Sequence, residues 1–162
     1  MLIWLLLSLT LIGIDQLSKA WVVATFASEG DTLPIINGFF HFTYVRNAGA
    51  VFGLGSEAGI YWVFIGAAIL AFAVFGYLLA KSDAKNKKLW LYHLAIALLI
   101  AGATGNFIDR LFQPDHHVVD FIDFRGIWNY VFNVADMCLV VGIGLFLFDQ
   151  FLLEPKREKI HG

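Results

Sequence analysis

Cysteine is nearly absent from this 162-residue sequence, and so is any pattern of metal ligands. The single cysteine, Cys138, excludes a disulfide bond within the chain, and it has no evident base beside it, so we expect a small core residue. No H-E-x-x-H motif occurs, and His116 and His117 are adjacent in sequence without a third ligand nearby. We therefore expect no metal and no cofactor.

Charge is also scarce. Charged residues make up 15% of the chain and hydrophobic residues 59%, and the mean hydropathy is +0.74. A soluble domain is about 45–50% apolar, and a chain this short cannot cover so much apolar surface with its own polar groups. The N-terminal stretch "MLIWLLLSLTLIGI" lacks a basic region, and its apolar character continues past "DQLSK". We interpret it as a retained membrane span and not a cleaved signal.

Four stretches reach the length of about 20 mostly apolar residues that a spanning helix needs. They are residues 2–26, 60–80, 89–108 and 132–153. Lysine is missing from the connections 27–59 and 109–131. These connections hold only Arg46, Arg110 and Arg125, whereas lysines gather in the loop "KSDAKNKK" and the tail "EPKREKIHG". The positive-inside rule then places both termini in the cytoplasm.

The two lysine-free connections contain β-branched and aromatic residues with partial alternation, as in "FFHFTYVRNAGAVFG" and "VVDFIDFRGIWNYVF". This pattern predicts short strands outside the cytoplasm. The segment "GSEAG" is read as a turn or a short interfacial helix. The expected fold is a mainly α membrane protein: one integral membrane domain over residues 1–162, with four transmembrane helices and a small extracytoplasmic β region.

Polar residues on three of the predicted spans lie at one depth. At 1.5 Å per residue, Asp15 and Lys19 are raised about 20 and 26 Å from the inner surface, and Asn106 about 25 Å. Asn133 and Asp136 lie within about 6 Å of the outer surface, at the start of the last span. Ionisable residues inside a membrane usually face the bundle interior and have a function. We therefore expect a polar site in the outer third of the bilayer.

Two carboxylates suggest the chemistry of this site. Asp136 begins the last span, and Asp120 lies in the segment "VVDF" that precedes it. Two close, half-buried carboxyl groups share one proton, so one can activate water while the other polarises a carbonyl. This is aspartyl peptide hydrolysis. A Ser18–Lys19 dyad is disfavoured because adjacent residues on a helix point apart. Asp136 could instead simply favour the helix dipole.

Five motifs resemble those of the lipoprotein signal peptidase family, also called signal peptidase II. They are "DQLSK", "RNAGAVFG", "GATGNFIDR", "VVDFIDF" and "FNVAD", in the expected order over the whole chain. The resemblance implies an aspartic endopeptidase of the bacterial inner membrane, with its active site near the periplasmic face. It implies removal of signal peptides from prolipoproteins by cleavage before a cysteine that carries a diacylglyceryl group. The expected partners are this substrate, membrane lipid and inhibitors of the globomycin type, and not nucleic acid.

The resemblance also implies site residues. The catalytic pair falls on Asp120 and Asp136. The supporting residues fall on Asp15, Lys19, Asn47, Gly49, Gly102, Asn106, Arg110 and Asn133.

Several of these residues have competing interpretations. For Asp15 and Lys19 we prefer a buried ion pair that supports the bundle over direct chemistry. Arg110 and Asn47 suit either structural contacts or the binding of substrate carbonyls or a lipid headgroup, and Asn133 suits positioning of Asp136 or of the backbone. Gly102 and Gly105 would permit close helix packing. Asp109 is expected to cap the third span at the water interface.

Two other classes of function are compatible with buried charges. A small transporter or proton-coupled channel needs polar residues across the whole membrane or at the midplane between repeats. The polar residues here stop short of the cytoplasmic side, and no internal repeat is visible. A non-enzymatic assembly factor would not require both Asp120 and Asp136.

The topology can be tested with reporter fusions. A reporter joined after Gly30 should be active outside the cytoplasm, and one joined after Lys85 should be active inside, because lysine-rich loops stay cytoplasmic. The opposite pattern would overturn the orientation and the predicted position of the site.

Overall fold

The computed structural model describes residues 1–49, 61–83 and 85–161, and only the backbone of residues 158–161. The segment "GSEAG", for which we expected a turn or short helix, lies outside the described residues. The elements in chain order are α1 (Leu2–Thr25), β1 (Thr32–Ile36), β2 (Phe40–Asn47), α2 (Tyr61–Lys81), the 3-10 helix η1 (Lys87–Leu89), α3 (Trp90–Phe112), β3 (Val118–Phe124), α4 (Val134–Phe148), the π-helix η2 (Asp149–Leu153) and α5 (Glu154–His161).

Four helical segments are long and apolar enough to cross a membrane, which confirms the predicted fold class. They are Leu2–Thr25, Tyr61–Lys81, Lys87–Phe112 and Val134–Arg157. The third extends four residues beyond the predicted end at residue 108. The fourth begins two residues later than predicted, because Asn133 caps it, and its helix continues through η2.

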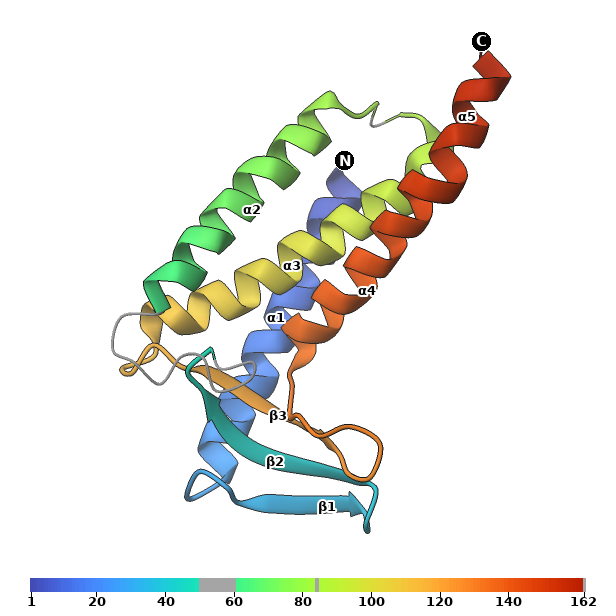
Figure 1. Ribbon diagram of the computed structural model, residues 1–162. Helices are drawn as coiled ribbons and strands as arrows, with labels where there is room; N and C mark the ends of the chain where they lie inside the picture. Colours follow the sequence, from blue (N-terminus) through green and yellow to red (C-terminus); the bar gives the residue numbers. More distant parts are fainter. Residues whose placement is uncertain (50–60, 84, 162) are drawn as a thin grey trace.

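Helix α3 is the centre of the bundle and packs against each of the other three spanning helices (Figure 1). Eleven of its 23 residues are buried, against four of 24 in α1, one of 21 in α2 and three of 15 in α4. Small residues on α3 make this possible because they let neighbouring backbones approach. Gly102 is one example: an added Cβ would lie 2.7 Å from Leu139 Cγ on α4. Apolar side chains on the outer helices face outward and suit contact with lipid.

A three-stranded antiparallel sheet in the order β1-β2-β3 lies at one end of the helices, and both termini lie at the opposite end (Figure 1). Strands β2 and β3 confirm the predicted strand segments. Their apolar residues form a small core with the end of α1, centred on Val22, Val119, Phe121 and Ile122. The sequence did not predict β1, whose five residues are all exposed. It contains Pro34, which is tolerated on an edge strand.

The opposite end of the bundle is closed by a buried ion pair. Asp149 is fully buried, and both of its oxygens accept hydrogen bonds from Arg157, at 2.9 and 2.6 Å. Arg157 also donates to the carbonyl oxygen of Lys88 at 3.2 Å. These bonds fasten the end of the last span to the beginning of α3.

Glycine packing can be tested on α4. A valine Cβ at Gly142 would lie 2.9 Å from Leu99 Cγ, so Gly142→Val should lower the free energy of unfolding by about 1–3 kcal/mol through overpacking. Gly144→Val is the matched control, since a Cβ there meets nothing within 4 Å. Unfolding in detergent micelles measures the effect, and equal stability of the two variants would contradict this view of the helix contact.

Candidate active site

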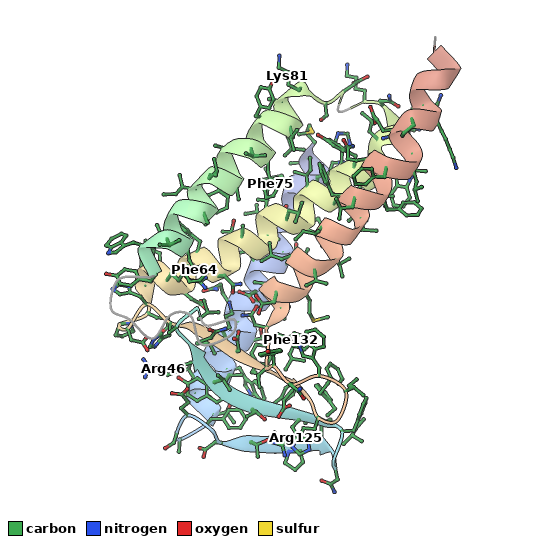
Figure 2. All side chains as sticks on the ribbon, viewed as in Figure 1. Arg46, Phe64, Phe75, Lys81, Arg125 and Phe132 are labelled. Atoms are coloured by element: carbon green, nitrogen blue, oxygen red, sulfur yellow. The ribbon has the colours of Figure 1, made fainter. Side chains whose placement is uncertain are left out.

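Buried polar side chains from α1, α3, β3 and the beginning of α4 meet where the helices join the sheet. They are Asp15, Lys19, Asn106, Asp109, Asp120 and Asn133, each at most 9% exposed. Figure 2 shows Phe64, Arg46 and Phe132 around this junction, and Lys81 at the far end of α2. The structure thus brings together the polar residues that helix geometry placed at a common depth.

Asn133 links the two acidic residues of the candidate pair. It is the N-cap of α4, and its Oδ1 accepts a hydrogen bond from the Asp136 backbone N–H at 2.9 Å. The Asp136 carboxylate accepts in return from the Asn133 backbone N–H at 3.2 Å, which completes a capping box. On its other side, Asn133 Nδ2 donates to Asp120 Oδ1 at 2.6 Å. The local sequence "NVAD" therefore caps a helix and positions a carboxylate at once.

Asn106 on α3 connects Asp136 to the buried ammonium group of Lys19. Its Oδ1 accepts from Lys19 Nζ and from Asn133 Nδ2, both at 3.1 Å. Its Nδ2 consequently faces Asp136 Oδ1 and donates to it at 2.7 Å. The amide orientation follows from the charge of Lys19, because an ammonium group can only donate.

Asn47 reaches Asp120 from β2. Its Nδ2 donates to Asp120 Oδ2 at 2.8 Å, and its own Oδ1 accepts from the Gly49 backbone N–H at 2.8 Å. Gly49 has a φ of 105°, a conformation that glycine adopts readily. A Cβ there would also collide with the Phe64 ring. The predicted residues Asn47 and Gly49 therefore act as one unit in the structure.

Burial and the neighbouring Asp136 carboxylate raise the pKa of Asp120 from its ordinary value of 3.8 to about 7. The hydrogen bonds from Asn47 and Asn133 and the charge of Lys19 oppose this rise. Asp120 thus holds a proton over much of the range up to neutral pH. Because the two carboxyl groups interact, the proton belongs to the pair.

Lys19 is buried between two carboxylates. Its Nζ lies 2.8 Å from Asp15 Oδ2 and 3.0 Å from Asp109 Oδ2. Asp15 Oδ1 also accepts from the Ala135 backbone N–H at 2.8 Å, next to Asp136. The prediction that Asp109 caps α3 at the water interface is wrong, since Asp109 is only 2% exposed. It is buried because the sheet covers this end of the bundle.

Arg110 approaches the pair from α3. Its guanidinium lies over the Phe64 ring, 4.6 Å from the centroid, and Nη1 donates to the Asn106 carbonyl at 3.2 Å. It interacts electrostatically with both Asp136 and Asp120. Its buried Nε has no hydrogen-bond partner among the described residues. Arg110 thus brings a positive charge near both carboxylates.

Sequence reasoning missed Gln16 and gave Asp109 a different role. Gln16 Nε2 lies 3.1 Å from each of three acceptors, on Asp15, Gly105 and Asp109. Asp109 follows Asn106 by three residues and therefore shares its helix face, which was the available signal. The rejected Ser18–Lys19 dyad does not form, since Ser18 Oγ bonds the Asp15 carbonyl.

Glycines on α3 make room for the network. A Cβ at Gly105 would lie 2.5 Å from Asp15 Oδ2 and 2.9 Å from Ala135 Cβ. Gly102 meets the backbone of α4 one turn away. Their contacts agree with the expected role in close helix packing.

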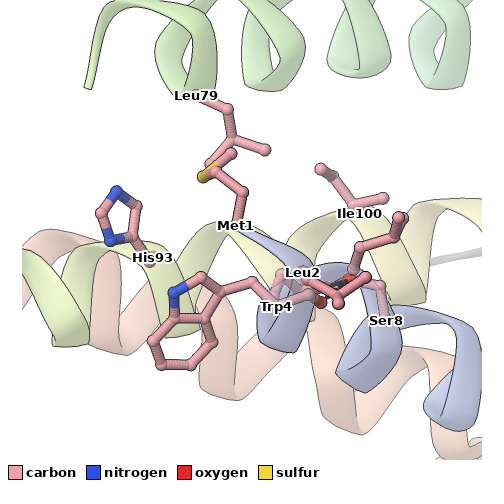
Figure 3. Close-up of a pocket in the computed structure, with 9 residues that line it drawn as sticks. Met1, Leu2, Trp4, Ser8, Leu79, His93 and Ile100 are labelled. Carbon is pink, nitrogen blue, oxygen red and sulfur yellow. Dashed lines mark hydrogen bonds between the residues drawn. The ribbon is translucent and has the colours of Figure 1, made fainter. Parts of the chain in front are cut away.

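A cavity of about 430 Å³ lies at the other end of the bundle (Figure 3). It is lined by Met1, Leu2, Trp4, Leu5, Ser8, Leu79, His93, Ala97 and Ile100. Its polar groups bond elsewhere: Ser8 to the Ala97 carbonyl and His93 to Ser82. Within the described part of the chain, no cluster of three potential metal ligands occurs. The acidic pair is therefore the candidate for chemistry.

Comparisons with known proteins show which family the chain resembles. A family model described as "Signal peptidase (SPase) II" matches residues 7–152. A lipoprotein signal peptidase of Clostridioides difficile is 46% identical over 97% of this chain and 100% of its own length. One from Fusobacterium nucleatum is 39% identical over 97% and 91%. A solved structure titled "Bacterial membrane enzyme structure by the in meso method at 2.3 A resolution" has a TM-score of 0.80 at 33% identity, covering 96% of this chain and 90% of that one.

The raised pKa of Asp120 predicts a pH-dependent stability. The unfolded state loses this proton near pH 3.8, whereas the folded state retains it to about pH 7, so the Asp120 contribution to stability falls as the pH rises between these values. Asp120→Asn should remove that contribution and flatten the pH dependence. Thermal unfolding between pH 4 and 8 measures it. Asp123→Asn, which removes a carboxylate from the same strand, is the control, and an identical pH dependence in wild type and Asp120→Asn would contradict the shift.

Proposed function

This chain belongs to the signal peptidase II family and is therefore a peptidase, and we propose that it is an aspartic endopeptidase whose catalytic residues are Asp120 and Asp136. The observation that carries the proposal is the sharing of Asn133 between the two carboxylates. One amide side chain bonds Asp120 directly, and the same residue forms the capping box with Asp136. Both acids are thereby kept beside one another at the edge of the bundle.

The proposed reaction uses the single proton of this pair. The ionised carboxylate removes a proton from water, whose oxygen attacks the scissile carbonyl carbon, while the protonated carboxyl group donates a hydrogen bond to the carbonyl oxygen. When the tetrahedral intermediate collapses, the C–N bond breaks and the amine nitrogen takes up a proton from the pair. Neither a metal nor a nucleophilic side chain takes part.

The proposed substrate is a prolipoprotein whose signal peptide is cut before a cysteine carrying a diacylglyceryl group. The position of the acids at the junction of helices and sheet supports this. The lipid chains could stay in the bilayer while the adjacent peptide bond reaches the pair. The Arg110 guanidinium and the Asn47 side chain suit binding of substrate carbonyls or of the lipid headgroup. An inhibitor of the globomycin type should compete for the same site.

We further propose that the protein lies in the bacterial inner membrane with both termini in the cytoplasm and the sheet on the periplasmic side. Exposed lysines at the end of the bundle opposite the sheet support this orientation (Figure 2). They include Lys81, Lys85, Lys87 and Lys88. In this orientation the acidic pair lies near the periplasmic face.

A transport function is less well supported by the interior of the bundle. Buried apolar residues such as Ile96 and Leu99 occupy α3 between the acidic network and the distant Asp149–Arg157 pair. These apolar side chains interrupt a polar path along α3. A purely structural assembly role does not explain two acids held on one asparagine.

Cleavage of a diacylated prolipoprotein by the purified protein tests the proposal. Asp120→Asn and Asp136→Asn should each lower the rate by at least about 100-fold, because each removes one half of the acid–base pair. Thermal unfolding should show that both variants remain folded.

The matched control is Asp123→Asn, which removes a carboxylate from β3 that bonds Thr43 and Arg125 and not the network. It should cleave at nearly the wild-type rate. Near-normal turnover by Asp120→Asn or Asp136→Asn would refute the catalytic assignment.

A further inference from the structure

The proposed reaction gives no role to Asp109, a fully buried carboxylate of the network. Asp109 lies in the last turn of α3 and is 2% exposed. Its Oδ2 contacts Lys19 Nζ at 3.0 Å and accepts from the Val119 backbone N–H at 3.1 Å. Its Oδ1 accepts from Gln16 Nε2 at 3.1 Å. It is thus the acid of the network that bonds directly to the backbone of β3.

The bond to Val119 matters because β3 is an edge strand. Its outer edge carries backbone N–H groups that need partners once buried. The Asp109 carboxylate accepts the hydrogen bond of the Val119 backbone N–H. The Phe132 carbonyl accepts from the backbone N–H groups of Phe121 and Ile122, at 3.0 and 2.7 Å. Asp120 lies between these two attachment points. The contact therefore helps to set where Asp120 stands relative to α4.

The bond to Lys19 matters for the charge at the pair. The Lys19 ammonium favours the ionised form of Asp120, and Asp109 and Asp15 counterbalance that ammonium. The charged groups around Asp109 are Asp15 and Lys19 on α1, Asp120 on β3, Asp136 on α4 and Arg110 on its own helix. Removing its negative charge leaves a more positive surrounding for the two acids.

We propose that Asp109 is a positioning residue for catalysis, which holds the strand that carries Asp120 and balances the charge of Lys19 beside the acidic pair. The inference rests on the proposed peptidase function. If Asp109 only stabilised the fold, its substitution would not shift the pH dependence of the reaction. Nor would it loosen β3 more than the rest of the protein.

Two substitutions separate the two parts of this role. Asp109→Asn keeps an oxygen that can accept from Val119 but removes the charge. Asp109→Leu has a similar size and removes both. Asp123→Asn is again the control, because it removes the same charge from a β3 residue that bonds Thr43 and Arg125 and not the network.

The pH profile of kcat measures the effect of the Asp109 charge on the acidic pair. Both limbs should move to lower pH in Asp109→Asn, by about one unit, because ionised acids are favoured when a nearby negative charge is lost. Lys19→Met should move the profile to higher pH, and the double variant should return it toward wild type. KM should stay within about twofold, because Asp109 is only 2% exposed and is out of reach of a substrate. A uniform loss of activity with an unmoved profile in Asp109→Asn would overturn the charge role.

Backbone hydrogen exchange measures how firmly β3 is held, independently of activity. Amides of β3 should exchange about fivefold faster in Asp109→Leu than in wild type, as expected for one lost hydrogen bond. Asp109→Asn and Asp123→Asn should change them less. Unchanged exchange in Asp109→Leu would overturn the positioning role. If Asp120→Asn retained activity, the peptidase mechanism would fail, while this measurement would still report on Asp109.

Discussion

The buried ammonium group of Lys19 is the interaction on which the polar end of this membrane protein depends. An isolated charge in an apolar interior is costly unless it is paired and fully hydrogen-bonded. Lys19 has three donors, and they meet Asp15, Asp109 and Asn106 from two helices. These contacts hold α1 and α3 in register, and they orient the Asn106 amide that faces Asp136. One cation thereby organises both the bundle and the site.

The site combines a common helix-capping motif with a strand, at the place where the helices meet the sheet. Asn133 and Asp136 form a capping box that any helix could use. This capping box differs from others because the side chain of its asparagine also donates a hydrogen bond to Asp120 on β3. Burial then raises the pKa of Asp120 to about 7, with the Asp136 charge adding to the effect. Folding thus supplies a carboxyl group that is protonated at a pH where an exposed aspartate is not.

Hydropathy and spacing predicted much of this fold, because lipid imposes simple requirements on the chain. The four spans and the common depth of the polar residues follow from these requirements. Strands β2 and β3 followed instead from their β-branched and aromatic residues. Strand β1 was missed because it is short, exposed and interrupted by Pro34. The end of α3 was placed too early because Asp109 and Arg110 resembled a polar boundary. Asp109 instead pairs with the buried Lys19, and the Arg110 guanidinium lies over the Phe64 ring.

The sequence by itself determined that the protein lies in a membrane, which residues span it and which polar groups share a level, since each of these depends on local composition and helix geometry. Only the tertiary structure decided that Asp120 and Asp136 meet on Asn133, and that Asp109 is a buried partner of Lys19. Those contacts join residues from different helices and from a strand. Their distances follow from how the sheet packs on the ends of α1 and α3, which no local pattern encodes.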